Sequence, residues 1–165
     1  MFYEVREINI ADYITEIETV IRLAFADVAE EFHLTPTNCP KHPSFLSDTD
    51  LIEPLSWPEV VCFGALLDDT LVGFTAIFPK SSRVYELTRL CVLPEHRHAG
   101  LGSKLVQAAL HSAEAYGARK VVIGIIAENA RLKRWYEGHG FRATAVREYA
   151  HLPFKVCEME RETIF

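Results

Sequence analysis

The chain has 165 residues, of which 49% are hydrophobic and 24% charged, as in globular proteins rather than in disordered or fibrous ones. This length is typical of one domain and allows a buried core, so we expect a single domain over residues 1–165. The formal net charge of −6 disfavours electrostatic binding to the phosphates of a nucleic acid, so nucleic acid is not an expected partner.

The first third of the chain predicts a strand, a helix and an irregular segment. Residues 3–8 alternate like a strand, and Asp12 is placed to cap a helix whose apolar residues recur at helical spacing. From about Glu30 to Pro58 the chain carries five of its eight prolines. Because proline interrupts helices and strands, we expect at most a short helix there, around residues 45–52.

The rest of the chain predicts six strands and two helices. The strands are expected at residues 60–67, 71–78, 84–92, 120–126, 142–149 and 154–161, and the helices at 101–117 and 129–136. The turn Asp68-Asp69-Thr70 closes a hairpin, and the continuous apolar run 120–126 predicts a strand that is buried on both faces. This order indicates an α/β (α+β) fold whose mixed, mostly antiparallel sheet has helices on both faces and one or two parallel crossovers.

The strand at residues 84–92 has an irregular apolar pattern. Leu87, Leu90 and Val92 are spaced three and then two positions apart, whereas strict alternation requires even steps. One extra residue near Arg89 restores the alternation, so we infer a β-bulge there. Such a bulge would splay the strand and leave backbone groups unpaired.

A glycine-bearing loop from Pro94 to Ser103 leads into the helix that follows. Its small residues allow the backbone to approach an anion, the helix N-terminus favours negative charge, and Arg97 can add a charge-assisted contact. We therefore predict a pyrophosphate-binding loop, with an ordinary strand-to-helix turn as the alternative. Rossmann and P-loop chemistry do not fit, because their glycine spacings would require glycine at Leu105 or at Arg97.

Two motifs give the chain a resemblance to the GNAT (Gcn5-related N-acetyltransferase) family. Arg97-His98-Ala99-Gly100-Leu101-Gly102 matches the family's acyl-CoA signature, and Asn129 precedes Tyr136 at the family's distance. The resemblance implies a GNAT acyl-CoA N-acyltransferase fold, with a sheet splayed at the β-bulge. It also implies an N-acetyltransferase that uses acetyl-CoA as cosubstrate and no metal.

The resemblance further implies which residues bind CoA. The pantetheine arm would bind to the backbone near the bulge, the pyrophosphate to amides of the loop, and an asparagine would approach the pantetheine or the adenosine. The residues concerned are Cys91, Val92, Arg97, His98, Ala99, Gly100, Leu101, Gly102, Ser103 and Asn129.

Two side chains are expected to act on the reacting groups. Tyr136 resembles the tyrosine whose hydroxyl protonates the departing CoA thiolate, and a strand N–H near Val92 could stabilise the oxyanion. Glu86 resembles a glutamate that removes the proton of the amine directly or through water. The alternatives are a packed core aromatic for Tyr136 and a solvated strand carboxylate for Glu86.

The remaining histidines and cysteines do not indicate a further reactive site. His33, Cys39 and His42 match no zinc spacing, and Cys91 has no partnering histidine in sequence, so we expect neither a metal site nor a cysteine nucleophile. The four scattered cysteines indicate buried free thiols in a reducing compartment. Without a signal peptide or a membrane-spanning stretch, the chain is expected in the cytoplasm with no membrane partner.

The expected activity is acyl transfer to a primary amine of a small molecule or peptide by direct attack. The alternative is a non-catalytic acyl-CoA-binding or sensor domain of the same fold, and a nucleotide-binding regulator is opposed by the loop spacings. No motif identifies the acceptor, and a homodimer is left open.

Overall fold

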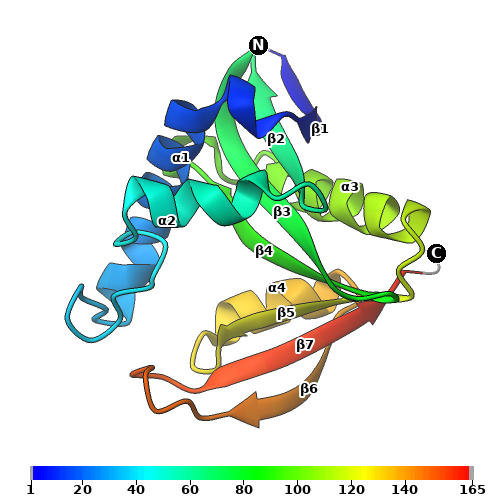
Figure 1. The fold of residues 1–165 in the computed structure, drawn as a ribbon. Coiled ribbons are helices and arrows are strands. Elements are labelled where there is room, and N and C mark those ends of the chain that lie inside the picture. Colours follow the sequence, from blue (N-terminus) through cyan, green and yellow to red (C-terminus); the bar gives the residue numbers. More distant parts are fainter. Residues whose placement is uncertain (1, 164–165) are drawn as a thin grey trace.

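The computed structural model describes residues 2–163, in which one mixed sheet has helices on both faces (Figure 1). The strands are β1 (Tyr3–Ile8), β2 (Val61–Leu67), β3 (Thr70–Ser81), β4 (Val84–Val92), β5 (Lys120–Ile126), β6 (Arg142–Arg147) and β7 (Val156–Glu162). The helices are α1 (Ile14–Glu31), α2 (Asp48–Ile52), α3 (Leu101–Ala115) and α4 (Ala130–Gly138), with short 3₁₀ turns η1 (Ile10–Asp12), η2 (Glu53–Ser56) and η3 (Pro94–His96).

The strands lie in the order β1-β2-β3-β4-β5-β7-β6 across the sheet. Neighbouring strands pair antiparallel except β4 and β5, which are parallel. The mostly antiparallel sheet expected from the sequence is therefore confirmed, with one parallel pair. That pair is short, because Val84–Glu86 pairs with Lys120–Val122 and no ladder continues beyond these residues in the described chain.

The helices divide between the two faces of the sheet. Leu105 and Ala109 of α3, together with Tyr136 of α4, pack against one face in the larger core cluster. Ile17 and Ile21 of α1 pack with α2 against the other face, where they cover β2, β3 and the end of β4. The half of this second face formed by β5, β7 and β6 carries no helix (Figure 1).

The sharpest turn of the predicted hairpin forms as its sequence requires. Asp68 and Asp69 adopt φ values of 47° and 70°, the left-handed conformation of tight hairpin turns, which aspartate tolerates better than most residues. They join β2 to β3, which runs three residues further than expected, to Ser81.

The predicted β-bulge is also confirmed. Ala76 of β3 pairs with Thr88, whereas Phe74 pairs with Cys91, so two residues of β4 lie opposite Thr75 alone. One of the two is Arg89, whose φ of 57° is left-handed. The bulge restores Leu90 and Val92 to the face of Leu87, as the spacing indicated.

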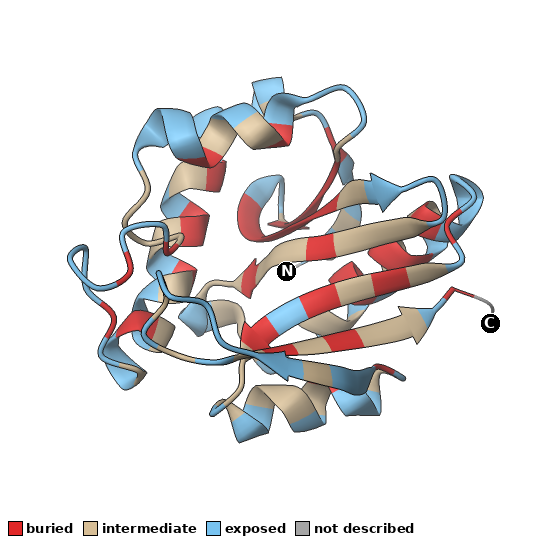
Figure 2. Cartoon of the chain, turned by 60° about the horizontal axis from the view of Figure 1, so that its bottom comes forward, coloured by how far each residue is buried: buried red, intermediate tan, exposed pale blue. Residues whose placement is uncertain are grey.

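Three sequence predictions about individual elements were wrong. Asp12 does not cap α1, because it lies within η1, and the residue at the N-cap of α1 is Tyr13, which makes no side-chain capping bond. The strand β5 is not buried on both faces: Val121, Ile123 and Ile125 are buried, while Gly124 between them is exposed (Figure 2). The reason is that α3 and α4 cover only one face of this strand.

The third difference lies at the end of the chain. The helix expected at 129–136 continues to Gly138, and the last two strands are shorter than expected, with β6 ending at Arg147 and β7 beginning at Val156. The connection between them is mostly exposed, and its Leu152 and Phe154 are partly buried against the cluster of Ala29, Leu34 and Cys39 instead of extending the strands.

Candidate functional site

The end of the β4–β5 pairing creates an unpaired strand edge. Beyond Glu86, the strand β4 continues beside β3, and Leu93 donates its N–H to the carbonyl oxygen of Val72 at 2.8 Å. Successive residues of a strand direct their N–H groups to alternate edges, so the N–H of Val92 is directed to the β5 side. This N–H lies where the two parallel strands have separated.

The loop after β4 presents a row of backbone donors. Gly100 occupies the N-cap of α3 with φ 80°, and His98 is also left-handed, with φ 68°. Within residues 2–163 no acceptor bonds the amides of residues 98–103. Helix N-termini of this kind attract anions through their N–H groups and dipole, so the arrangement fits a bound phosphate.

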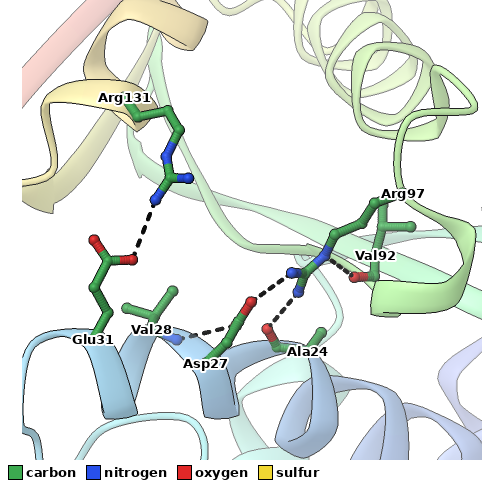
Figure 3. A network of polar contacts seen from close by, with 7 residues as sticks. All are labelled: Ala24, Asp27, Val28, Glu31, Val92, Arg97 and Arg131. Carbon is green, nitrogen blue, oxygen red and sulfur yellow. Dashed lines mark hydrogen bonds and ion pairs between the residues drawn. The ribbon is translucent and has the colours of Figure 1, made fainter.

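The side chain of Arg97 is turned away from these amides (Figure 3). Its Nε donates to the carbonyl oxygen of Val92 at 3.0 Å, its Nη2 donates to that of Ala24 at 2.9 Å, and its Nη1 pairs with Asp27. All three guanidinium nitrogens are thus engaged with the protein. In this orientation the guanidinium does not make the charge-assisted anion contact expected from the sequence.

Asp27 and its neighbours hold α1 against the loop. Burial acts to raise the pKa of Asp27, but the hydrogen bond and charge of Arg97 outweigh it, so that the pKa lies below its usual value. One turn further along α1, Glu31 pairs with Arg131 of α4 at 3.3 Å across more exposed surface. Both pairs were missed from the sequence, because their members are far apart in the chain.

The second motif lies on α4. Asn129 is the N-cap, and its Oδ1 accepts the N–H of Leu132 at 3.2 Å, which leaves the amide nitrogen to donate. Tyr136 is 5% exposed and lies edge-on to the rings of Trp135 and Phe141. Burial raises the pKa of Tyr136 strongly, so the phenol stays protonated at neutral pH.

His139, which sequence reasoning missed, joins α4 to Ser103 at the start of α3. The Nδ1 of His139 lies 2.8 Å from the carbonyl oxygen of Trp135, so this nitrogen carries the proton, and the Nε2 of a neutral ring then accepts from the hydroxyl of Ser103 at 2.8 Å. The Trp135 ring lies 3.3 Å from the place of a Cβ on Gly102. The glycine therefore serves helix packing as well as backbone approach.

Glu86 lies on the opposite side of the sheet from Tyr136, at the last residue of β4 that pairs with β5. It lines an open groove of about 500 Å³ over the uncovered half of the sheet, with Lys120, Gly124, Tyr149 and Glu158 among the other lining residues. Within residues 2–163 the carboxylate of Glu86 forms no ion pair or hydrogen bond. Glu158 and Glu160, in contrast, are paired with arginine or lysine.

The buried thiols do not form a reactive site. Burial raises the pKa of Cys91 to about 12, so it remains a thiol at neutral pH and packs in the cluster beneath α1. Cys39 packs with apolar neighbours. No three His, Cys, Asp or Glu side chains group as metal ligands anywhere in residues 2–163, and no helix there combines the length and apolar character needed to cross a bilayer.

The predicted site residues thus fall into two groups. Those expected to bind CoA surround the separation of β4 and β5: Cys91 and Val92 on β4, the residues 97–103 before and within α3, and Asn129 after β5. Tyr136 lies in α4 on the side of α3, and Glu86 faces the groove on the other side. The tyrosine and the carboxylate therefore lie on opposite faces of the sheet.

Comparison with known proteins places this geometry in a family. The sequence model of the acetyltransferase (GNAT) family matches residues 26–141. An uncharacterised N-acetyltransferase of Mycobacterium tuberculosis is 28% identical over 119 residues, which is 69% of this chain and 76% of that protein.

Solved structures share the fold over the whole chain. The PaiA N-acetyltransferase of Thermoplasma acidophilum, in complex with coenzyme A, has a TM-score of 0.74 and 21% identity and covers 98% of this chain and 99% of its own. The ribosomal-protein-S18-alanine N-acetyltransferase of Escherichia coli has a TM-score of 0.77 and 14% identity and covers 99% and 96%.

Proposed function

The chain belongs to the acetyltransferase (GNAT) family, and we propose that it transfers an acetyl group from acetyl-CoA directly to the primary amine of a small molecule or peptide. The observation that carries this proposal is the early end of the β4–β5 pairing, after Glu86 and Val122. It leaves an opening through the sheet that has backbone donors on one side and a free carboxylate on the other.

The described residues offer a binding site for each part of acetyl-CoA. The unbonded amides of residues 98–103 would hold the pyrophosphate, and the β4 edge near Val92 would bond the pantetheine arm. Asn129, which keeps its amide nitrogen for donation, would contact the pantetheine or the adenosine. The acetyl group would then lie where β4 and β5 separate.

The groups around that point match the needs of aminolysis. The amine nitrogen attacks the thioester carbon while Glu86, directly or through a water molecule, takes its proton. The N–H of Val92 donates to the developing oxyanion, and as the carbon–sulfur bond breaks the hydroxyl of Tyr136 gives its proton to the thiolate. Burial raises the pKa of Tyr136, so the phenol is protonated before the reaction begins.

Thiol release tests the proposal. Acetyl-CoA is mixed with a broad panel of amines, free CoA is measured with a thiol reagent, and acetylated products are identified by mass. We expect acceptor-dependent CoA release that falls at least about a hundredfold in Glu86→Gln, while the thermal shift produced by CoA is unchanged. Glu59→Gln, at an exposed glutamate before β2, is the matched control.

The same experiment separates the enzyme from a sensor domain. A sensor would be stabilised by CoA but would release no thiol with any amine, whereas a nucleotide-binding regulator would be stabilised by ATP rather than CoA. We further propose that the chain is a single domain, because one sheet contains all seven described strands. We also propose that it acts in the cytoplasm, because its four buried cysteines are all free thiols.

A further inference from the structure

Arg89 has an unusual place in the structure. It is the left-handed residue of the β-bulge, with φ 57°, a conformation that costs a non-glycine residue energy. Leu90, its neighbour opposite Thr75, packs toward α3. The two bulge residues therefore diverge, and Arg89 is the one that does not join the apolar core.

The charges that act on or respond to Arg89 belong to residues on the groove side of the sheet. Its charge acts on His42, in the segment after α1, and on Cys91, while the charge of Glu86 acts on Arg89 in return. Glu86 lines the groove and Cys91 packs under α1 and α2. Arg89 thus lies between the groove and the segment that follows α1.

No hydrogen bond or ion pair within the described chain engages the guanidinium of Arg89. It is half-buried, yet within residues 2–163 it makes no ion pair and no hydrogen bond. Six other arginines do pair with carboxylates: Arg6, Arg22, Arg97, Arg131, Arg142 and Arg147. A half-buried guanidinium that forms no ion pair or hydrogen bond within the protein keeps its donors available to an anion from outside the chain.

His42 adds a second donor on the same side. The Nδ1 of this buried histidine accepts the N–H of Ser44 at 3.2 Å, so a neutral ring carries its proton on Nε2. Burial and the charge of Arg89 lower the pKa of His42 to about 4, so the ring is neutral at physiological pH. The Nε2–H makes no hydrogen bond within residues 2–163 and can donate to an acceptor beside Arg89.

Arg89 and Glu86 together form a separated pair of opposite charges. No ion pair joins the two side chains within the described residues, so their nitrogen and oxygen atoms are more than ion-pair distance apart. The guanidinium donors and the carboxylate oxygens are therefore both available to a ligand on the same side of the sheet. A molecule with an amine and a carboxylate matches this arrangement. The CoA phosphates do not, because the free amides that fit them begin at residue 98, beyond the end of β4.

We infer that the acceptor is an amino acid or a similar small molecule that carries both a primary amine and a carboxylate, with Arg89 and His42 binding the carboxylate and Glu86 facing the amine. This inference rests on the proposed function. It makes Arg89 a specificity-determining residue of the acceptor site. Aminoglycosides and polyamines, which lack the carboxylate, are poor fits.

The test compares acids with their neutral analogues. Acetyl-CoA is incubated with the protein amino acids, β-alanine and γ-aminobutyrate, each beside its carboxamide and its decarboxylated amine, and with polyamines and aminoglycosides. For the best acceptor we expect kcat/KM to exceed that of its carboxamide by at least about tenfold, the effect of losing a charge-assisted hydrogen bond. In Arg89→Asn, which suits the left-handed φ, this ratio should fall to near one while the KM for acetyl-CoA is unchanged.

The ratio is measured within each variant, so a partial loss of folding does not affect it. Arg134→Asn, at an exposed arginine of α4, should keep the wild-type ratio. Acetylation of amines without a carboxylate at equal or higher kcat/KM, or a ratio unchanged in Arg89→Asn, would overturn the inference and leave the proposed function standing. Absence of transfer to every amine would overturn the proposed function and, with it, the inference.

Discussion

Arg97 and Asp27 join the loop before α3 to helix α1, although 70 positions separate them in the chain. The same guanidinium also bonds the carbonyl oxygen of Val92, at the strand edge where β4 and β5 separate. The arginine of the family signature therefore fixes the shape of the loop, and the loop backbone remains available to an anion. Loss of this ion pair should lower the affinity for CoA more than it lowers the free energy of unfolding.

We predict that Asp27→Ala lowers CoA affinity by about three- to tenfold, because Arg97 loses its carboxylate partner and the loop becomes less constrained. The cost in unfolding free energy should be small, at most about 1 kcal/mol, since the pair is partly exposed. Calorimetric titration with CoA and chemical denaturation measure the two quantities. Glu31→Ala, which removes the neighbouring pair with Arg131, is the matched control and should bind CoA normally.

The same pair should respond to acid. Because the pKa of Asp27 is below its unfolded value, the stability that it contributes is present above about pH 4 and is lost as pH falls through the lowered value. The stability difference between wild type and Asp27→Ala should therefore close at low pH. A difference that stays constant down to pH 2 would contradict this role.

Gly100 tests the loop backbone. A Cβ at this position would meet nothing within 4 Å, but φ is 80°, so valine would be strained whereas asparagine tolerates the conformation. We predict that Gly100→Asn keeps most of the stability and still weakens CoA binding by more than about tenfold, because its side chain enters the space of the phosphate. Affinity within about threefold of wild type would rule out an anion site on these amides.

Gly102→Val is a less discriminating variant than Gly100→Asn. Its Cβ would lie 3.3 Å from the Trp135 ring, so the substitution disturbs the packing of α4 on α3 as well as any ligand. It should lower both the unfolding free energy and the CoA affinity. The sequence analysis gave the small residues of this loop only the role of letting the backbone approach an anion.

Tyr136→Phe separates chemistry from packing. It keeps the ring that contacts Trp135 and Phe141, so stability and CoA affinity should change little. If the hydroxyl protonates the thiolate, the single-turnover rate with an identified acceptor should fall at least about a hundredfold. An unaltered rate in the folded variant would assign the proton to solvent or another group and leave Tyr136 as a packing residue.

His42 should make the free energy of unfolding depend on pH between its folded and unfolded pKa values. Its folded pKa of about 4 lies below the unfolded value of 6.5, so unfolding takes up a proton between these values. Stability is full above pH 6.5 and should decline as pH falls toward 4, by an amount on the order of a few kcal/mol. Denaturation curves across this range measure the slope.

Two variants check the origin of this slope. His42→Asn should flatten it, whatever its effect on absolute stability. Arg89→Asn should raise the pKa of His42, which NMR titration of the ring can follow, because the arginine charge disfavours the protonated ring. A pKa of His42 that does not move in Arg89→Asn would contradict the proximity of the two side chains.

The sequence by itself determined the local elements and the family of this protein. The strands Tyr3–Ile8, Val84–Val92 and Lys120–Ile126 follow from apolar periodicity, and the phase slip between Leu87 and Leu90 located the bulge, because these patterns act over a few residues. The two motifs, one before α3 and one in α4, likewise lie in short contiguous stretches, and the family match over residues 26–141 agrees with them.

Only the tertiary structure decided what the side chains of the site meet. The partner of Arg97 on α1, the bond from His139 to Ser103 and the unpartnered guanidinium of Arg89 all depend on segments brought together by packing. The one-sided burial of β5 arose in the same way, because it depends on which face the helices cover. Such contacts join residues that are distant in sequence, so no local pattern of residue types encodes them.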